Sequence, residues 1–120
     1  MTWEIVLAPE VEEWYLSLDP QSSDNVTKAI GILEEAGPNL GRPLVDRLHS
    51  SKLHNLKELR TPSNNRGHIR ILFVFDSTRQ AILLVAGDKA GRWRQWYVDA
   101  IKLAEERYAR YLETPPEEIV

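Results

Sequence analysis

The sequence predicts a single α+β domain, in which two N-terminal helices pack on an antiparallel sheet that is followed by a C-terminal helix. Three observations predict it. Two segments with helical apolar spacing come early, three strand-like segments joined by short turns come next, and a third helical segment follows them. Strands in this order form an antiparallel meander, so we expect an α+β domain with the helices segregated on one side of the sheet.

The composition is that of one soluble globular domain. The chain has 120 residues, of which 42% are hydrophobic and 28% are charged, close to the averages for such proteins. The longest apolar run, residues 81–87, is too short to cross a bilayer, and residues 1–10 do not resemble a secretory signal. With no cysteine in the chain, we expect a cytoplasmic protein with one domain over residues 1–112 and a short acidic tail over residues 113–120.

The first third of the chain predicts a short strand and a helical hairpin. Residues 3–8 (WEIVLA) are rich in β-branched and aromatic side chains. They end at Pro9, which cannot continue a central strand but suits the first turn of a helix. Helical spacing then continues to residues 19–20 (DP). A second helix is expected from roughly residue 22 to residue 35, where a Gly-Pro pair at residues 37–38 stops it.

The middle of the chain predicts the meander. Residues 39–55 have no sustained period and are expected to form a loop. Residues 56–60 (LKELR) alternate and lead into a turn rich in Pro, Asn and Gly. Residues 68–75 (HIRILFVF) place Ile and Phe on one face and His, Arg, Leu and Val on the other, while residues 81–86 (AILLVA) suit a strand that is buried on both faces. Helical spacing over residues 95–112 completes the pattern.

Charge is distributed unevenly around the formal net charge of −3. Residues 1–41 contain one Lys and eight carboxylates, residues 42–102 contain twelve Lys or Arg and five carboxylates, and residues 103–120 contain two Arg and five Glu. A basic middle between acidic ends favours a basic surface for an anionic partner, because local potential steers association. Charge alone is equally compatible with cations that simply lie in solvent.

Arg70 is the first candidate for a functional side chain. It lies inside a strongly apolar strand, so it must either face solvent or pair with an anion, and Glu58 on the neighbouring strand is the candidate partner. Three further cations flank the same hairpin: Lys57, Arg60 and Arg66. Together they could form a basic sheet surface that holds a nucleic-acid backbone.

The histidines carry no metal signature. His49, His54 and His68 are accompanied by no HExxH motif and no cysteine, and we expect no metal and no other cofactor. His68 shares the face of Arg70 by the period of two, and an imidazole there could act as a general acid or base. No P-loop, dinucleotide-binding, serine-hydrolase or paired-carboxylate motif occurs, so the common nucleotide-binding and hydrolase families lose support.

A cluster of cations and aromatic residues follows the buried strand. It is the stretch GDKAGRWRQWY, residues 87–97, which contains Lys89, Arg92, Trp93, Arg94, Trp96 and Tyr97. The cations could contact RNA phosphates, while one of the three rings could stack on a base, the combination used in single-strand binding. The alternative is that the two tryptophans pack the last helix on the sheet, which we favour for Trp96.

The order and spacing of these segments resemble the RelE/HigB (Gp49-like) toxins of bacterial toxin–antitoxin systems. The similarity covers roughly residues 3–112. It rests on LKELR (Leu56–Arg60), GHIRILFVF (Gly67–Phe75), ILLVAGDK (Ile82–Lys89) and YVDAIKLAEERYARYL (Tyr97–Leu112). The resemblance implies a microbial ribonuclease-like fold and an endoribonuclease that cleaves messenger RNA without a metal, commonly on the ribosome, through attack of the RNA 2′-hydroxyl on the adjacent phosphate.

The resemblance also implies roles for single residues. Arg70 matches the family's sheet arginine and would stabilise the phosphate, with Arg60 as a supporting cation. Lys89 matches the basic residue of the loop after the apolar strand and could stabilise the transition state. Tyr97 matches a position where some members carry a catalytic tyrosine, so that His68 and Tyr97 are the two candidates for the general base.

Two departures from the family pattern and two alternative functions accompany this interpretation. Glu58 stands where RelE-type members have a basic residue, and Asp88 stands where a second cation is common. The implied partners are a cognate antitoxin with a helix-turn-helix domain, mRNA and the ribosome, with operator DNA bound only through the antitoxin. The alternatives are a non-catalytic nucleic-acid-binding or regulatory protein on the same fold, and a plain protein-interaction domain.

Overall fold

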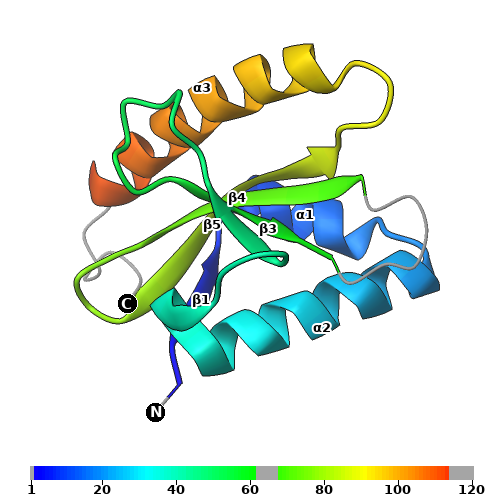
Figure 1. The fold of residues 1–120 in the computed structure, drawn as a ribbon, viewed down its shortest axis with the longest axis horizontal. Coiled ribbons are helices and arrows are strands. Elements are labelled where there is room, and N and C mark those ends of the chain that lie inside the picture. Colours follow the sequence, from blue (N-terminus) through cyan, green and yellow to red (C-terminus); the bar gives the residue numbers. More distant parts are fainter. Residues whose placement is uncertain (1, 62–67, 114–120) are drawn as a thin grey trace.

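The computed structural model describes residues 2–61 and 68–113 and has the predicted α+β class (Figure 1). The elements in chain order are β1 (Glu4–Leu7), α1 (Pro9–Leu16), α2 (Pro20–Ala36), the 3₁₀ turn η1 (Gly37–Asn39), β2 (Val45–Arg47), β3 (Lys57–Arg60), β4 (Ile69–Phe75), β5 (Gln80–Asp88) and α3 (Trp93–Glu113). Arg66 lies outside the described residues, as does the expected tail beyond Glu113.

The five strands form one mixed sheet in the order β1-β5-β4-β3-β2. The predicted meander is present, because β3, β4 and β5 are antiparallel neighbours along the chain. The sheet is not antiparallel throughout, however: β1 runs parallel to β5, with Ile5 opposite Ala81. Parallel neighbours need a long connection, and here the two N-terminal helices and the other three strands together supply it.

Helices cover both faces of the sheet. The helices α1 and α2 lie on one face and α3 lies on the other (Figure 1). The expectation that all helices lie on one side is therefore wrong, and β4 gives the reason. Ile71 and Phe73 pack with Leu33 of α2, whereas Leu72 packs with Ala104 of α3. A central strand that is apolar on both faces needs a cover on each.

The second helix begins two residues earlier than expected because Asp19 caps it. The Asp19 carboxylate accepts a hydrogen bond from the backbone N–H of Ser22 at 3.2 Å, and Pro20 occupies the first helical turn. The helix ends at Gly37, whose φ of 57° belongs to the left-handed region. A Cβ there would lie 2.4 Å from Nε1 of Trp3. Glycine is therefore required for two reasons, because the backbone angle is left-handed and because the indole leaves no room for a Cβ.

Strand β2 was not predicted. It occupies three residues of the segment 39–55 that was expected to be a loop, and it pairs antiparallel with β3 at the edge of the sheet, with Val45 opposite Leu59. Only Val45 of the three residues is buried. A strand this short with one buried residue has too few positions to show a period of two, so its pairing partner rather than its own pattern defines it.

The junction between β5 and α3 brings the last helix close to the sheet. The strand β5 continues through Asp88 and α3 begins at Trp93, so each element extends two residues further into the junction than expected. A Cβ on Gly87 would lie 2.9 Å from Nε1 of Trp96. The half-buried Trp96 thus packs α3 on the sheet, as predicted. No helix in the described part of the chain has the length and apolarity needed to cross a membrane.

Candidate functional site

Three charged side chains share the sheet face that α3 covers. In the register of β3 and β4, Arg60 lies opposite Arg70 and Glu58 lies opposite Leu72. Residues directly opposite one another share a face, and so do residues two apart on one strand. Because Leu72 packs toward α3, Glu58, Arg60 and Arg70 all point to that side.

Glu58 is the centre of this arrangement. It is buried, with 4% of its surface exposed. Its Oε2 accepts a hydrogen bond from Nη2 of Arg60 at 2.9 Å, and its Oε1 lies 3.6 Å from Nε of Arg70. Oε1 also accepts a hydrogen bond from the hydroxyl of Tyr97 on α3. We call these four residues, Glu58, Arg60, Arg70 and Tyr97, the Glu58 cluster. A buried carboxylate is tolerated here because cations and a hydrogen-bond donor surround it.

A second carboxylate holds Arg60 from the edge strand. Asp46 of β2 lies opposite Glu58, and its Oδ2 is 3.4 Å from Nη2 of Arg60 and 3.2 Å from Nε of Arg42. A hydrogen bond from Arg42 is the main cause that lowers the pKa of Asp46. Arg60 also donates to the carbonyl of Pro43 at 3.2 Å. The Arg60 guanidinium is therefore fixed in place by three groups.

Arg70 and Tyr97 are more deeply enclosed. The Arg70 side chain is 11% exposed and donates through Nη1 to the carbonyl of Ile69 at 3.0 Å. Burial first, and then the hydrogen bond to Glu58, raise the pKa of Tyr97 to about 12. The phenol therefore keeps its proton at neutral pH and acts there as a hydrogen-bond or proton donor.

Aromatic rings extend from Tyr97 toward solvent. The Tyr97 ring meets the Trp96 ring edge-on, with centroids 5.1 Å apart, and the Trp93 ring with centroids 6.4 Å apart. Trp93 is 49% exposed and carries the guanidinium of Arg94 at 5.2 Å from its ring centroid. The start of α3 thus joins a buried charged cluster to an exposed aromatic surface.

His68 and Lys89 meet at the same end of the sheet as Arg70. The backbone N–H of Lys89 donates to the carbonyl of His68 at 3.0 Å, and Arg70 lies opposite Gly87 in the adjoining register. Asp88 turns into its own loop, where it accepts a hydrogen bond from the N–H of Ala90 at 2.8 Å. The backbones of the predicted loop cation and the predicted histidine therefore lie side by side at the end of β4 and β5 that carries Arg70.

The other predicted contacts are more dispersed. Arg92 and Arg94 are exposed at the start of α3. Lys57 alternates with Glu58 on β3 and lies on the opposite face, where its Nζ is 5.2 Å from the ring centroid of Phe75. Lys57 also lines a cavity of about 470 Å³ beside β2. Of the cations that were predicted to share one sheet surface, only Arg60 and Arg70 do so among the described residues.

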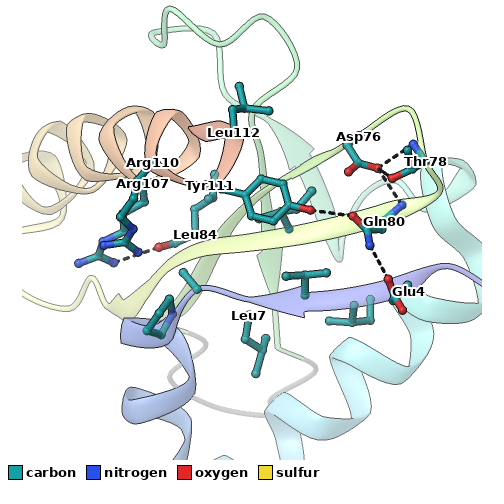
Figure 2. Close-up of a pocket in the computed structure, with 15 residues that line it drawn as sticks. Glu4, Leu7, Asp76, Thr78, Gln80, Leu84, Arg107, Arg110, Tyr111 and Leu112 are labelled. Carbon is teal, nitrogen blue, oxygen red and sulfur yellow. Dashed lines mark hydrogen bonds between the residues drawn. The ribbon is translucent and has the colours of Figure 1, made fainter. Parts of the chain in front are cut away.

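A larger cavity, of about 930 Å³, lies at the C-terminal end of α3 (Figure 2). Its floor comes from β1 and β5, with Arg107 and Arg110 at one end and Glu4 and Gln80 at the other. The hydroxyl of Tyr111 donates to Gln80 at 2.7 Å across its top. None of the predicted site residues that the structure describes lines this cavity, so cavity size and predicted chemistry point to different places.

The Glu58 cluster brings two guanidiniums and one phenol to the same buried carboxylate. Guanidiniums are charge-assisted hydrogen-bond donors, and the phenol carries a proton. Within residues 2–61 and 68–113, no three His, Cys, Asp or Glu side chains lie close enough together to hold a metal ion. The role of Glu58 as a hub was missed from the sequence, although the two-residue period of LKELR and its pairing with Arg70 pointed to it.

Comparison with known proteins gives a family. The family model described as phage-derived protein Gp49-like (DUF891) matches residues 13–109. HigB3 from Mycobacterium tuberculosis (strain ATCC 25618 / H37Rv), which is named as a toxin, is 48% identical over 108 residues, covering 90% of this chain and 92% of that protein.

Solved structures share the fold at low sequence identity. A mutant of the Escherichia coli toxin RelE in the free state matches with a TM-score of 0.61 and 12% identity, covering 85% of this chain and 97% of that one. The toxin–antitoxin complex RelBE2 from M. tuberculosis matches with a TM-score of 0.55 and 17% identity, covering 73% of this chain and 99% of that one. At these identities the likeness establishes the fold.

Proposed function

Since the chain belongs to the Gp49-like group of the RelE/HigB toxin family, we propose that it is the toxin of a toxin–antitoxin module and a metal-independent endoribonuclease. It cleaves mRNA in association with the ribosome and thereby inhibits translation. The observation that carries the proposal is the meeting of Arg60, Arg70 and Tyr97 at one buried carboxylate. Arginine guanidiniums match the geometry of phosphate oxygens, and the same face carries a proton donor.

The proposed reaction is transesterification at the RNA backbone. His68 accepts the proton of the 2′-hydroxyl, and the 2′-oxygen forms a bond to the adjacent phosphorus. The bond from phosphorus to the 5′-oxygen breaks, and Tyr97 gives its proton to the departing 5′-oxygen. The products are a 2′,3′-cyclic phosphate and a free 5′-hydroxyl. Arg70, Arg60 and Lys89 stabilise the charge that develops on the phosphate oxygens.

The division between acid and base follows from the environment of Tyr97. Because burial and Glu58 raise the pKa of Tyr97 to about 12, its phenol holds a proton that a leaving alkoxide can take. The same shift makes Tyr97 a weak candidate for the general base, since very little phenolate exists at neutral pH. His68, beside Lys89 at the end of β4, is the remaining one of the two predicted candidates.

The proposed partners follow the family. Toxins of known structure with this fold include one solved as a complex with its antitoxin, and we propose a cognate antitoxin for this chain. It carries a helix-turn-helix domain, through which the complex reaches operator DNA. Arg92, just before α3, and Arg94, in its first turn, are proposed contacts to RNA or the ribosome. Lys57 and Arg66 are proposed for the same role, and the protein acts in the cytoplasm.

Expression of the chain alone in a bacterium tests this function. Arrest of growth with cleavage of mRNA is expected from the wild type, and Arg70→Ala and Lys89→Ala relieve both. Lys102→Ala is the matched control, because Lys102 is an exposed cation on α3. Soluble wild-type protein that causes neither arrest nor cleavage contradicts the proposal.

One observation favours the alternative of a non-catalytic nucleic-acid-binding protein. Arg70 is 11% exposed and its guanidinium faces Glu58, so a phosphate reaches it only if this contact opens. A protein that binds RNA through its exposed cations without opening the cluster would bind and not cleave. RNA binding by the wild type that persists without any cleavage, in the presence of ribosomes, supports this alternative.

A further inference from the structure

The exposed ring of Trp93 contacts the Tyr97 ring of the Glu58 cluster. Trp93 is the first residue of α3, and Tyr97 follows it one turn later on the same side of the helix. The two rings meet edge-on with centroids 6.4 Å apart, while the Tyr97 hydroxyl reaches Glu58. A ligand on Trp93 is therefore adjacent to whatever Arg70 and Tyr97 hold.

Only one of the three rings in this row is available for stacking. Trp96 is half-buried against Gly87 and the core beneath α3. The Tyr97 ring makes T-shaped contacts with both neighbouring rings, and its hydroxyl donates a hydrogen bond to Glu58. Trp93 is 49% exposed although it is a large aromatic residue. The structure thus agrees with the packing role predicted for Trp96 and separates Trp93 from Tyr97, which the sequence did not.

The charges around Trp93 suit a nucleotide. Arg94 places its guanidinium 5.2 Å from the Trp93 ring centroid, and Arg92 precedes it as an exposed cation. The nearby carboxylates are engaged in local hydrogen bonds, Asp88 with the N–H of Ala90 and Asp99 with the side chain of Gln95. An aromatic face between cations is the pairing that binds single-stranded nucleic acid, where the ring stacks on a base and the cations hold phosphates.

We propose that Trp93 is a stacking platform for a nucleobase of single-stranded RNA, the base of a nucleotide next to the phosphate held by Arg70. The proposal rests on the proposed function, because it names the part of the RNA that this surface receives. A base is favoured over a protein side chain as the occupant because the platform is continuous with Tyr97 and bordered by cations. Trp93 binds and orients the RNA and takes no part in proton transfer.

The test measures binding without cleavage. The probe is a short fluorescent single-stranded RNA with 2′-fluoro sugars, which lack the attacking hydroxyl, and a second probe of the same length is abasic throughout. Stacking on one base corresponds to about 5- to 150-fold in affinity. We expect Trp93→Ala to weaken binding of the base-containing probe by a factor in this range and Trp93→Phe to weaken it less. Binding of the abasic probe should change little.

Two controls separate stacking from other effects. Val98 is 63% exposed on the same helix, so Val98→Ala removes exposed apolar surface without removing a ring and should leave binding unchanged. Arg70→Ala should weaken both probes, because it removes a phosphate contact. If Trp93→Ala and the wild type bind the base-containing probe equally, the inference is wrong and the proposed function stands. The same holds if Trp93→Ala weakens binding to the antitoxin protein but not to the RNA probe. Failure of the wild type to bind either probe, both without and with ribosomes, overturns the proposed function as well.

Discussion

Among single residues, Glu58 matters most for the site, because its carboxylate balances the positive charges of Arg60 and Arg70. Its carboxylate is 4% exposed and faces Arg60, Arg70 and Tyr97. Removing one partner of a buried ion pair leaves the other uncompensated, so we expect Glu58→Ala to lower the free energy of unfolding by about 3–5 kcal/mol in urea denaturation. Asp46→Ala is the control, since the Asp46 side chain is 25% exposed and its loss should cost much less than the loss of Glu58. Equal losses would contradict the central position of Glu58.

The ionisation of Tyr97 gives a prediction at high pH. Its pKa is raised from 10.0 to about 12 in the folded protein, so the folded state holds this proton longer than the unfolded chain does. The stability contributed is present below pH 10 and is lost as the pH rises toward 12. We expect Tyr97→Phe to make the fall in stability between pH 10 and 12 shallower in denaturation measured against pH. Identical slopes would show that Tyr97 ionises normally.

Strand alternation predicted part of the site, and contacts between distant residues completed it. The pairing of Arg70 with Glu58 follows from two neighbouring strands and was predicted. The same alternation places Lys57 on the face opposite Glu58, a consequence that was not drawn from LKELR. The bond from Tyr97 to Glu58 joins residues 39 positions apart, and no local pattern predicts it, because it depends on where α3 crosses the sheet.

At the scale of elements, Gly87 sets how closely α3 approaches β5. A Cβ there would lie 2.9 Å from Trp96 Nε1, so the indole and the start of α3 would have to shift. We expect Gly87→Ala to lower the free energy of unfolding by about 1–3 kcal/mol and to reduce RNA cleavage by displacing Tyr97. Thermal unfolding and a cleavage assay measure the two effects.

Gly31 in α2 provides the matched control. A Cβ at Gly31 meets no atom within 4 Å, and alanine is the better residue in a helix, so Gly31→Ala should raise stability by about 0.5–1 kcal/mol. Its cleavage activity should match that of the wild type. If Gly87→Ala behaves like Gly31→Ala, the close approach of Trp96 is not what positions the helix.

Elements with strong patterns were predicted, and elements defined by their partners were not. The apolar run 81–86 and the alternating run 68–75 became β5 and β4, and the Gly-Pro stop ended α2. Strand β2 was missed because its extended structure depends on pairing with β3. The side on which α3 packs was predicted wrongly because helix placement was inferred from chain order. The two apolar faces of β4, already visible in the sequence, required a cover on both sides.

At the scale of the whole molecule, an ion-pair cluster ties the two helical layers together. Arg110 of α3 binds Glu10 of α1 through two hydrogen bonds of 2.7 Å, and Arg107 lies 3.8 Å from the same carboxylate. The hydrogen bond from Arg110 is the main cause that lowers the pKa of Glu10 from 4.5 to about 2.

The ion pairs of Glu10 predict how the stability of the protein changes at acid pH. A carboxyl group whose pKa is lower in the folded state than in the unfolded chain stabilises the fold at any pH above its unfolded-state pKa. For Glu10 this contribution is lost as the pH falls from 4.5 to 2. We expect Glu10→Gln to flatten the acid side of the stability profile over this range, with Glu12→Gln, an exposed neighbour on α1, as the control. If Glu10→Gln leaves the dependence of stability on pH unchanged, the ion pair does not stabilise the protein in solution. Many exposed ion pairs contribute nothing measurable.

The most direct test of the whole account is the chemistry of the RNA ends. After induction of the chain in a bacterium, sequencing of RNA that carries a 5′-hydroxyl should reveal new ends within mRNA, matched by 2′,3′-cyclic phosphates on the upstream fragments. Arg70→Ala should abolish these ends, and Lys102→Ala should leave them in place. Cleavage that yields 5′-phosphates, or that persists in Arg70→Ala, would contradict a reaction centred on the Glu58 cluster.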